Sequence, residues 1–359
     1  MSVDTEPLMA AFALDSAVPT NKQSGNVNVV YRCRRVADQA EVFVRVTPHT
    51  HRTARQVEAE IAFQEGLAAS GIPVAKPLRT NKGTRVLCLG NQGLAVCFES
   101  VRGRAAVRPS DFTASFVRSW ALLLARLHSH SEHHAADFSH GPESGRKDWS
   151  DDAVLRTALE DKALETAEFS NLLRQQISWI QRLSRSDRTF SLTHADLQIS
   201  NIHVIDSGLP SLAFFDLDDC CFHYFVHDLA VACTQLRKAG IETAGAVDAA
   251  SLEEHLITCY ASARGFSAEE EAGLRAALPE FVKYRAALVS ERRAKTRLPF
   301  RACRASLVHG VPPHIPPVAS LAIALRKRWR TFGASRLKTW LTLSYRAPRN
   351  KATAPRYTR

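Results

Sequence analysis

Thr193-His194-Ala195-Asp196-Leu197-Gln198-Ile199-Ser200-Asn201, followed by Phe214-Phe215-Asp216-Leu217-Asp218-Asp219, is the stretch that decides the fold of this chain of 359 residues. It places an Asp, an Asn five residues later and a second Asp fifteen residues beyond that, with apolar runs between them. Phosphoryl transfer from a nucleotide needs such a set. One carboxylate orients the attacking hydroxyl and accepts its proton, while an amide oxygen and another carboxylate hold Mg²⁺.

The apolar runs 202–205 and 212–215 predict a β-hairpin, joined by the turn residues Asp206-Ser207-Gly208. A hairpin returns the chain to the end at which it started. Asn201, before the first strand, and Asp216, after the second, are therefore expected to meet around one cation. The alternative for these residues is a surface hairpin with solvated acids.

The same residues resemble the aminoglycoside phosphotransferase and choline kinase-like family, especially its homoserine-kinase-like members. Their pattern reads roughly H-G-D-L-H-x-x-N, then D-F-D-D-C-x-x-G and D-L-A. The resemblance implies a two-lobed, protein-kinase-like α+β fold that uses ATP and Mg²⁺. It makes Asp196 the catalytic residue, Asn201 and Asp216 the metal ligands, and His194 and Asp228 structural supports of the catalytic loop.

Two positions depart from that pattern, and neither removes a functional group. Ala195 stands where the family usually has Gly, and His223 stands where it often has another Gly. Ala195 disfavours a positive φ at its position.

The amino-terminal third fits the nucleotide-binding half of such a kinase. A turn-rich loop precedes two strand-like runs, 29–36 and 41–46, although no Walker A or G-x-G-x-x-G motif occurs. By resemblance, Asn28 belongs to a loop over the phosphates, and Arg45 replaces the usual phosphate-contacting Lys. Arg also suits phosphate. The helical stretch 53–69 offers Glu58 and Glu60 as partners for this cation, and Glu60 matches the family position.

Next, runs 85–89 and 94–99 predict a second hairpin that ends at Ser100-Val101-Arg102-Gly103. The resemblance makes this segment a hinge, where adenine bonds to main chain near Glu99 and Val101. Helical spacing predicts helices at 116–127, 153–183, 229–238, 252–264 and 269–290, with a break or kink at Pro279. We predict a nucleotide-binding lobe at 1–100, a helical lobe at 101–318 and a basic extension at 319–359.

Charge is concentrated in that extension. Residues 321–359 contain eleven Lys or Arg and no acids, which equals the net charge of +11 for the whole chain. Its apolar residues include Leu325, Trp329 and Trp340. Such a segment is compatible with docking on the helical lobe, which we favour, with an anionic membrane surface, or with nucleic acid.

The remaining motifs give weaker signals. The eight cysteines lack C-x-x-C spacing and predict buried thiols in a reducing compartment. H-x-x-x-H spacing at 130/134 and 223/227 is compatible with zinc, whereas the histidines at 128–134 are better explained as a solvated helix end. Without a signal peptide or an apolar stretch of membrane length, a cytoplasmic protein is expected.

Together these patterns predict an ATP-dependent kinase of a small-molecule hydroxyl. An amino alcohol, an amino acid, an aminoglycoside and a sugar all stay open as acceptors. The acids of Lys147-Asp148-Trp149-Ser150-Asp151-Asp152 either hold a substrate amine or cap a helix. Two other functions stay open. One is a Ser/Thr protein kinase, disfavoured because no activation loop ends in A-P-E. The other is a nucleotide-binding pseudokinase acting through its tail.

Overall fold

The computed structural model describes residues 3–20, 27–106, 109–135, 145–153, 155–156, 168–205 and 211–297. The predicted basic extension, Cys303 and the turn at 206–208 lie outside these residues, as does most of 154–167. The three predicted domain boundaries therefore stay predictions. In the described part of the chain, no helix combines the length and apolarity that a membrane crossing requires.

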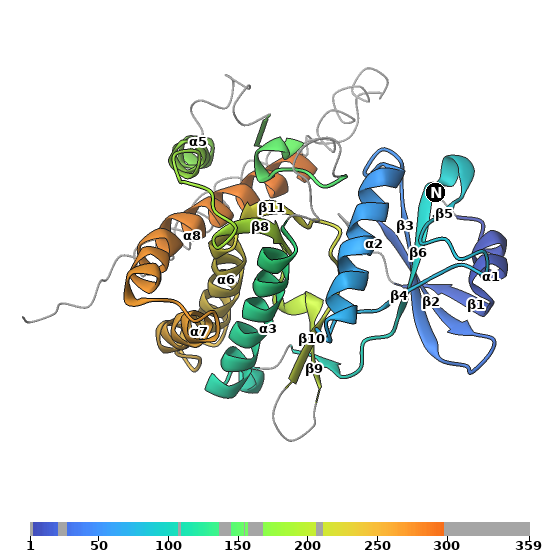
Figure 1. Cartoon of the computed structure of the whole chain (residues 1–359), viewed down its shortest axis with the longest axis horizontal. Helices are drawn as coiled ribbons and strands as arrows, with labels where there is room; N and C mark the ends of the chain where they lie inside the picture. Colours follow the sequence, from blue (N-terminus) through green and yellow to red (C-terminus); the bar gives the residue numbers. More distant parts are fainter. Residues whose placement is uncertain are drawn as a thin grey trace, which may run out of the picture. The chain divides into compact units, whose positions relative to one another are not determined.

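The amino-terminal lobe is an antiparallel sheet with two helices (Figure 1). Its strands lie in the order β1-β2-β3-β6-β4, with β5 paired to β6. The elements are α1 (Glu6–Phe12), β1 (Leu14–Pro19), β2 (Val29–Arg35), β3 (Glu41–Thr47), α2 (Ala54–Ala69), β4 (Pro77–Leu78), β5 (Leu87–Cys88), η1 (Gly90–Gln92) and β6 (Leu94–Glu99). The sequence did not predict α1 or β1.

Alternation along the central strands gives each face of this sheet its own core. Leu94 and Val96 of β6 pack with Val57 and Ile61 of α2. The alternate residues of β6, Ala95 and Cys97, pack in the other cluster, with β2, β3 and α1. Paired residues on neighbouring strands share a face, and Arg45 pairs with Val96. The register therefore directs Arg45 toward α2.

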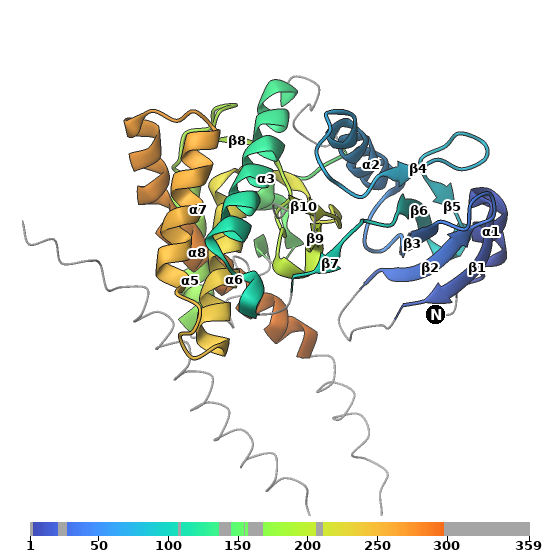
Figure 2. The same ribbon diagram turned by 90° about the horizontal axis from the view of Figure 1, so that it is seen from below.

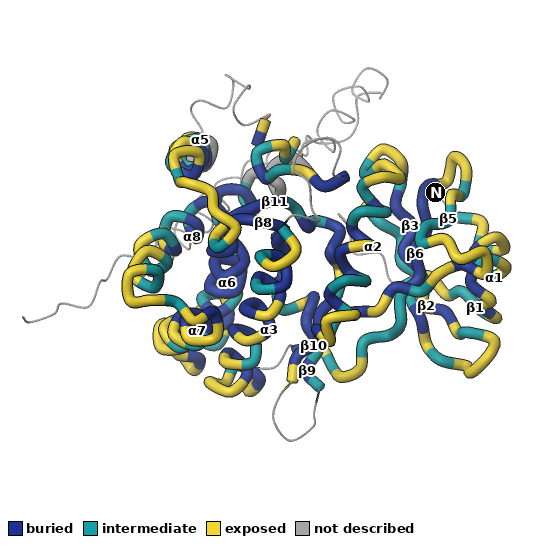
Figure 3. The backbone as a smooth tube through the Cα atoms, viewed as in Figure 1, coloured by how far each residue is buried: buried dark blue, intermediate teal, exposed yellow. Residues whose placement is uncertain are grey.

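The carboxy-terminal lobe is mainly helical, and helix α3 packs against α7 while α6 and α5 both pack against α8 (Figure 2). Its elements are β7 (Arg104–Ala105), η2 (Pro109–Asp111), α3 (Ala114–His133), η5 (Trp149–Asp151), α5 (Glu168–Ile180), β8 (Phe190–Thr193), η7 (Ile199–Asn201), β9 (Ile202–Ile205), β10 (Ser211–Phe214), β11 (Cys221–Tyr224), α6 (Val226–Glu242), α7 (Ala249–Ala263) and α8 (Ala268–Arg297). Buried segments run through the middle of both lobes (Figure 3).

The predicted hairpin is present, with Phe214 paired to Ile202 at its open end. Strand β9 also pairs with β7, and β11 pairs with β8. The predicted break at Pro279 is wrong, because α8 continues through this residue. Packing against α5 and α6 holds the helix together where its local propensity is poor.

Pro279→Ala should stabilise the protein by about 1–3 kcal/mol, because Ala restores an N–H donor in the middle of α8 and removes a ring that opposes helical geometry. The side chain is exposed, so no packing is lost. Chemical denaturation measures the gain. Pro7→Ala, in the first turn of α1, is the matched control and should give no comparable gain, because an N–H there has no intrahelical acceptor. Equal effects at both sites would contradict this account.

Candidate active site

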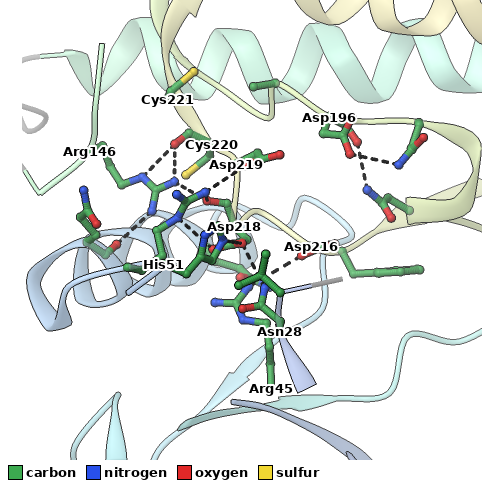
Figure 4. Close-up of a pocket in the computed structure, with 18 of the residues that line it drawn as sticks. Asn28, Arg45, His51, Arg146, Asp196, Asp216, Asp218, Asp219, Cys220 and Cys221 are labelled. Carbon is green, nitrogen blue, oxygen red and sulfur yellow. Dashed lines mark hydrogen bonds and ion pairs between the residues drawn. The ribbon is translucent and has the colours of Figure 1, made fainter. Parts of the chain in front are cut away.

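The open end of hairpin β9–β10 brings the predicted metal ligands together. The N–H of Phe215 donates to the carbonyl of Asn201 at 3.1 Å, so Asp216 follows directly beside Asn201. The amide nitrogen of Asn201 donates to the carbonyl of Asp196 at 3.0 Å. All three predicted catalytic-loop residues therefore lie at one end of the hairpin. They line a cleft of about 1190 Å³ that both lobes contribute to (Figure 4).

Asp228 at the start of α6 holds the catalytic loop from behind. Its two carboxylate oxygens accept the backbone N–H groups of His194 and Ala195, at 2.9 and 2.8 Å. Ala195 has a φ of 62°, the left-handed conformation that an Ala tolerates poorly. The ring of His194 donates to the carbonyl of Phe215 at 3.1 Å, which ties the loop to the second strand. The supporting positions predicted for His194 and Asp228 fit this geometry.

A second layer lies behind Asp228. His128 of α3 donates its Nε2 proton to Asp228 at 3.1 Å, and its Nδ1 lies 2.8 Å from the hydroxyl of Tyr260 on α7. Burial lowers the pKa of His128, so the ring is neutral. The prediction of a solvated helix end is wrong for His128 and His130, which are buried, and holds for His133 and His134. Sequence spacing did not reveal the contact between His128 and Asp228, because these residues lie 100 positions apart.

Across the cleft, Arg45 and Glu60 form the ion pair that the sequence predicted. Two parallel hydrogen bonds of 2.8 Å join the guanidinium to the carboxylate, and both side chains are buried. Burial opposes the charge on Arg45, but Glu60 more than compensates and raises the pKa of the guanidinium. Arg45 also lies 3.7 Å from Asp216 and over the ring of Phe98. Its charge therefore faces the predicted metal ligands.

The second acid of the Asp216-Leu217-Asp218-Asp219 string joins the lobes (Figure 4). Asp218 accepts from Asn28 at 3.0 Å, from His51 at 2.8 Å and from Arg52 at 3.1 Å. Burial opposes ionisation of Asp218, but His51 and the neighbouring arginines lower its pKa overall. Asn28, predicted to contact phosphate, thus already has a carboxylate partner.

Arg146 strengthens the same junction through main-chain carbonyl groups. Its guanidinium donates to the carbonyls of Asp218 and Cys220, both at 2.8 Å, and to that of Gln56 in α2 at 3.0 Å. Sequence reasoning missed Arg146, because nothing in its local sequence marks a side chain that binds distant backbone.

The predicted hinge residues Glu99 and Val101 both line the cleft. The N–H of Glu99 donates to the carbonyl of Lys76 at 2.9 Å, and the carbonyl of Val101 lies 3.2 Å from Nδ1 of His203. Adenine recognition at this segment would use its other main-chain groups. The prediction that Glu99 and Val101 contact adenine is untested.

Oxygen atoms suited to Mg²⁺ gather between Asn201 and Asp216. The amide nitrogen of Asn201 is fixed by its bond to Asp196, which turns the amide oxygen the other way. Enclosure in the cleft raises the pKa of Asp216 to about 6; Arg45 opposes this rise, whereas Asp218 and Glu60 add to it. A bound cation would relieve that cost. Carboxylate and amide oxygens are also the ligands that Mg²⁺ prefers, so these residues fit the predicted ion.

The two H-x-x-x-H pairs have other contacts. His223 and His227 stack face to face with ring centroids 4.2 Å apart. The Tyr224 N–H donates to Nδ1 of His223, and Nε2 of His227 lies 3.3 Å from the carbonyl of Ala195. His130 lies 3.0 Å from the hydroxyl of Ser70. Among the described residues, no group of three or more His, Cys, Asp or Glu has a metal-binding arrangement.

Near Asp196, which we call the acceptor end of the cleft, two of the acids predicted either to hold an amine or to cap a helix, Asp148 and Asp152, accept backbone N–H groups as caps do. Asp148 accepts from the N–H and hydroxyl of Ser150 and pairs with Arg185 at 2.7 Å. From α8, Arg285 reaches Asp196 and pairs with its carboxylate.

Residues 23–266 match the phosphotransferase enzyme family. This chain belongs to that family. A 211-residue stretch is 26% identical to amicoumacin kinase of Bacillus subtilis (strain 168), and the match covers 57% of this chain and 59% of the relative. The chain therefore spans less than two thirds of that curated relative.

Solved structures confirm the predicted two-lobed, kinase-like α+β fold. An amicoumacin kinase in complex with AMP-PNP and Ca²⁺ has a TM-score of 0.66 at 18% identity, covering 89% of this chain and 90% of that chain. A microcompartment-associated aminopropanol kinase has a TM-score of 0.58 at 18% identity, covering 84% and 97%. At this identity the likeness concerns the fold alone.

Asp228→Asn should destabilise the protein by about 3 kcal/mol, because an amide NH₂ would face a backbone N–H and leave buried donors unpaired. Denaturant titration measures the loss. Asp248→Asn is the matched control: Asp248 caps α7 by accepting the N–H of Ser251 on the surface, and Asn caps equally well. A near-neutral Asp228→Asn would mean that this carboxylate does not hold the catalytic loop.

Proposed function

We propose that this protein is an ATP-dependent phosphotransferase that phosphorylates a hydroxyl of a small molecule. The observation that carries the proposal is the grouping of Asp196, Asn201 and Asp216 at one end of a hairpin, with the Arg45–Glu60 pair opposite. Family membership supports the same reaction class.

Each residue has a chemical task in this proposal. Asp196 orients the acceptor hydroxyl and takes its proton as the new bond forms. Asn201 and Asp216 would hold Mg²⁺, which neutralises charge on the phosphates. Arg45 offsets further phosphate charge, and Glu60 keeps its guanidinium aimed into the cleft by a bidentate contact. Asn28, Glu99 and Val101 line the nucleotide end.

The pseudokinase alternative depends on Arg45, which replaces a Lys in many relatives. The bidentate pair with Glu60 supports a phosphate-binding role, because a guanidinium held in this way keeps its charge and orientation. A role of the basic extension at an anionic membrane or on nucleic acid stays a prediction, since those residues lie outside the described part of the chain.

Asp196→Asn should lower the turnover number by about 10²- to 10⁴-fold while Mg·ATP still binds, because the proton acceptor is lost and both metal ligands stay. Asp216→Ala should instead weaken Mg·ATP binding, because the negative ligand is lost. Calorimetry with and without Mg²⁺, together with ADP release, separates the two effects. Asp187→Asn, an exposed residue outside the cleft lining, is the control and should change neither quantity. Normal turnover in Asp196→Asn would exclude its catalytic role.

Arg45→Ala and Glu60→Ala should each weaken nucleotide binding, and the double variant should lose less than the sum, because the two side chains act as one unit. Nucleotide titrations of the four proteins give the coupling free energy. The control cycle uses Arg237 and Glu253, another bidentate pair, which joins α6 to α7 outside the cleft lining. Substitutions at Arg237 and Glu253 should lower the free energy of unfolding but leave nucleotide affinity unchanged. Full additivity at Arg45 and Glu60 would argue against the coupled grip.

A further inference from the structure

A column of stacked rings forms one wall of the acceptor end of the cleft. Trp149 of η5 stacks on His223 of β11, with centroids 5.3 Å apart and planes 18° apart. His223 stacks in turn on His227, whose Nε2 meets the carbonyl of Ala195, next to Asp196. Tyr284 of α8 packs edge-on against all three rings. The column therefore extends from η5 to the catalytic loop.

Two N–H groups in this wall have no hydrogen-bond partner among the residues that the structure describes. Trp149 and His223 are 3% and 2% exposed, and both line the cleft. The indole Nε1 and the imidazole Nε2 are buried without a hydrogen bond. Because the N–H of Tyr224 donates to Nδ1 of His223 at 2.8 Å, Nδ1 is an acceptor and Nε2 carries the proton. Burial lowers the pKa of His223 well below its usual value, consistent with a neutral ring.

Buried donors without acceptors cost about 1–3 kcal/mol each. A ligand in the cleft that supplies the acceptors would offset this cost. Arg285, with 6% of its surface exposed, adds a positive charge beside Asp196 at this end of the cleft. Tyr284 links the ring column to Arg285, because it packs on the column and is the residue before Arg285 in α8.

The acids at this end do not favour a cationic ligand. Asp148 is engaged by Ser150 and Arg185, and Asp152 accepts from the N–H of Leu155. Asp196 is paired with Arg285. An amine entering here would have to compete for acids that already have partners, and it would leave the two N–H groups unsatisfied.

We propose that the acceptor end of the cleft recognises a carboxylate on the alcohol to be phosphorylated. Arg285 supplies the charge, and Trp149 Nε1–H and His223 Nε2–H supply hydrogen bonds. This inference rests on the proposed function in one respect: the proposed function identifies the bound molecule as the phosphate acceptor. It departs from the amino alcohol that the name of the aminopropanol kinase indicates for that enzyme.

Three compounds of equal length test the charge preference: 3-hydroxypropionate, 3-hydroxypropionamide and 3-aminopropan-1-ol. Ligand-observed NMR titrations use the full chain with Mg²⁺ and AMP-PNP at constant ionic strength. The carboxylate should bind at least about tenfold more tightly than the amide or the amine, because only it accepts charge-assisted bonds from three donors. Equal or tighter binding of the amine or the amide, or no binding by any of the three, overturns the proposal.

Trp149→Phe isolates the hydrogen bond, because it removes the indole N–H and keeps an aromatic ring in the column. It should weaken carboxylate binding about tenfold. The smaller ring also loses packing in this buried position, so the melting temperature of the free protein should fall modestly, and the affinity for the carboxylate is the deciding measurement. If Trp149 has only a structural role, Trp149→Phe will lower the melting temperature and leave carboxylate affinity intact. That result overturns the proposal. Trp179→Phe, which packs on Phe281 outside the cleft lining, is the control for affinity.

The two proposals fail in different ways. Selective carboxylate binding without phosphoryl transfer to any alcohol would overturn the proposed function and leave this site intact. Transfer to alcohols without a carboxylate preference would overturn the site and leave the function intact.

Discussion

The catalytic loop depends on one carboxylate without access to water, that of Asp228. It accepts two consecutive backbone N–H groups from the loop, and His128 and Tyr260 continue the hydrogen-bond chain into α3 and α7. Burial alone would disfavour the charge, but the bonds from His128 and its neighbours lower the pKa of Asp228 overall. Because charge-assisted bonds in a buried site are strong and directional, this contact fixes Ala195 in its left-handed conformation and thereby aims Asp196.

The three acids of the Asp216-Leu217-Asp218-Asp219 string divide the work between binding and assembly. Asp218 and Asp219 both contact Arg52, and Asp218 also binds His51, so they join the lobes. Asp216 has only a long contact with Arg45 among the ion pairs of the described residues, and its pKa is raised because enclosure in the cleft, together with Asp218 and Glu60, outweighs the positive charge of Arg45. The same local sequence thus supplies Asp218 and Asp219, which already have partners, and, two residues before Asp218, a carboxylate that favours a cation.

Local and periodic signals made the reaction centre predictable. Asn201 and Asp216 flank a short hairpin, so pairing of its strands is enough to bring them together. Arg45 and Glu60 were identified by their match to the family's positions, and the structure shows them paired. His128, Arg146 and the Asp218 clamp could not be predicted, because their partners lie far away in sequence and leave no periodic trace. Strand β11 was missed for a related reason, since its pairing with β8 is not local.

Two arginines lie at different ends of the cleft, and their positions bear on both acceptor binding and proton transfer. Arg45 lies near Asp216 at the nucleotide end, whereas Arg285 pairs with Asp196 at the acceptor end. In the proposed reaction, an anionic acceptor would share Arg285 with Asp196, which would weaken that ion pair as Asp196 takes the proton. An ammonium group would not draw on Arg285 and would add a second positive charge beside Asp196, which lowers the basicity of this carboxylate. Under the two proposals, the pairing of Arg285 with Asp196 would therefore couple binding of the acceptor to proton transfer, and it would favour acceptors that carry negative charge.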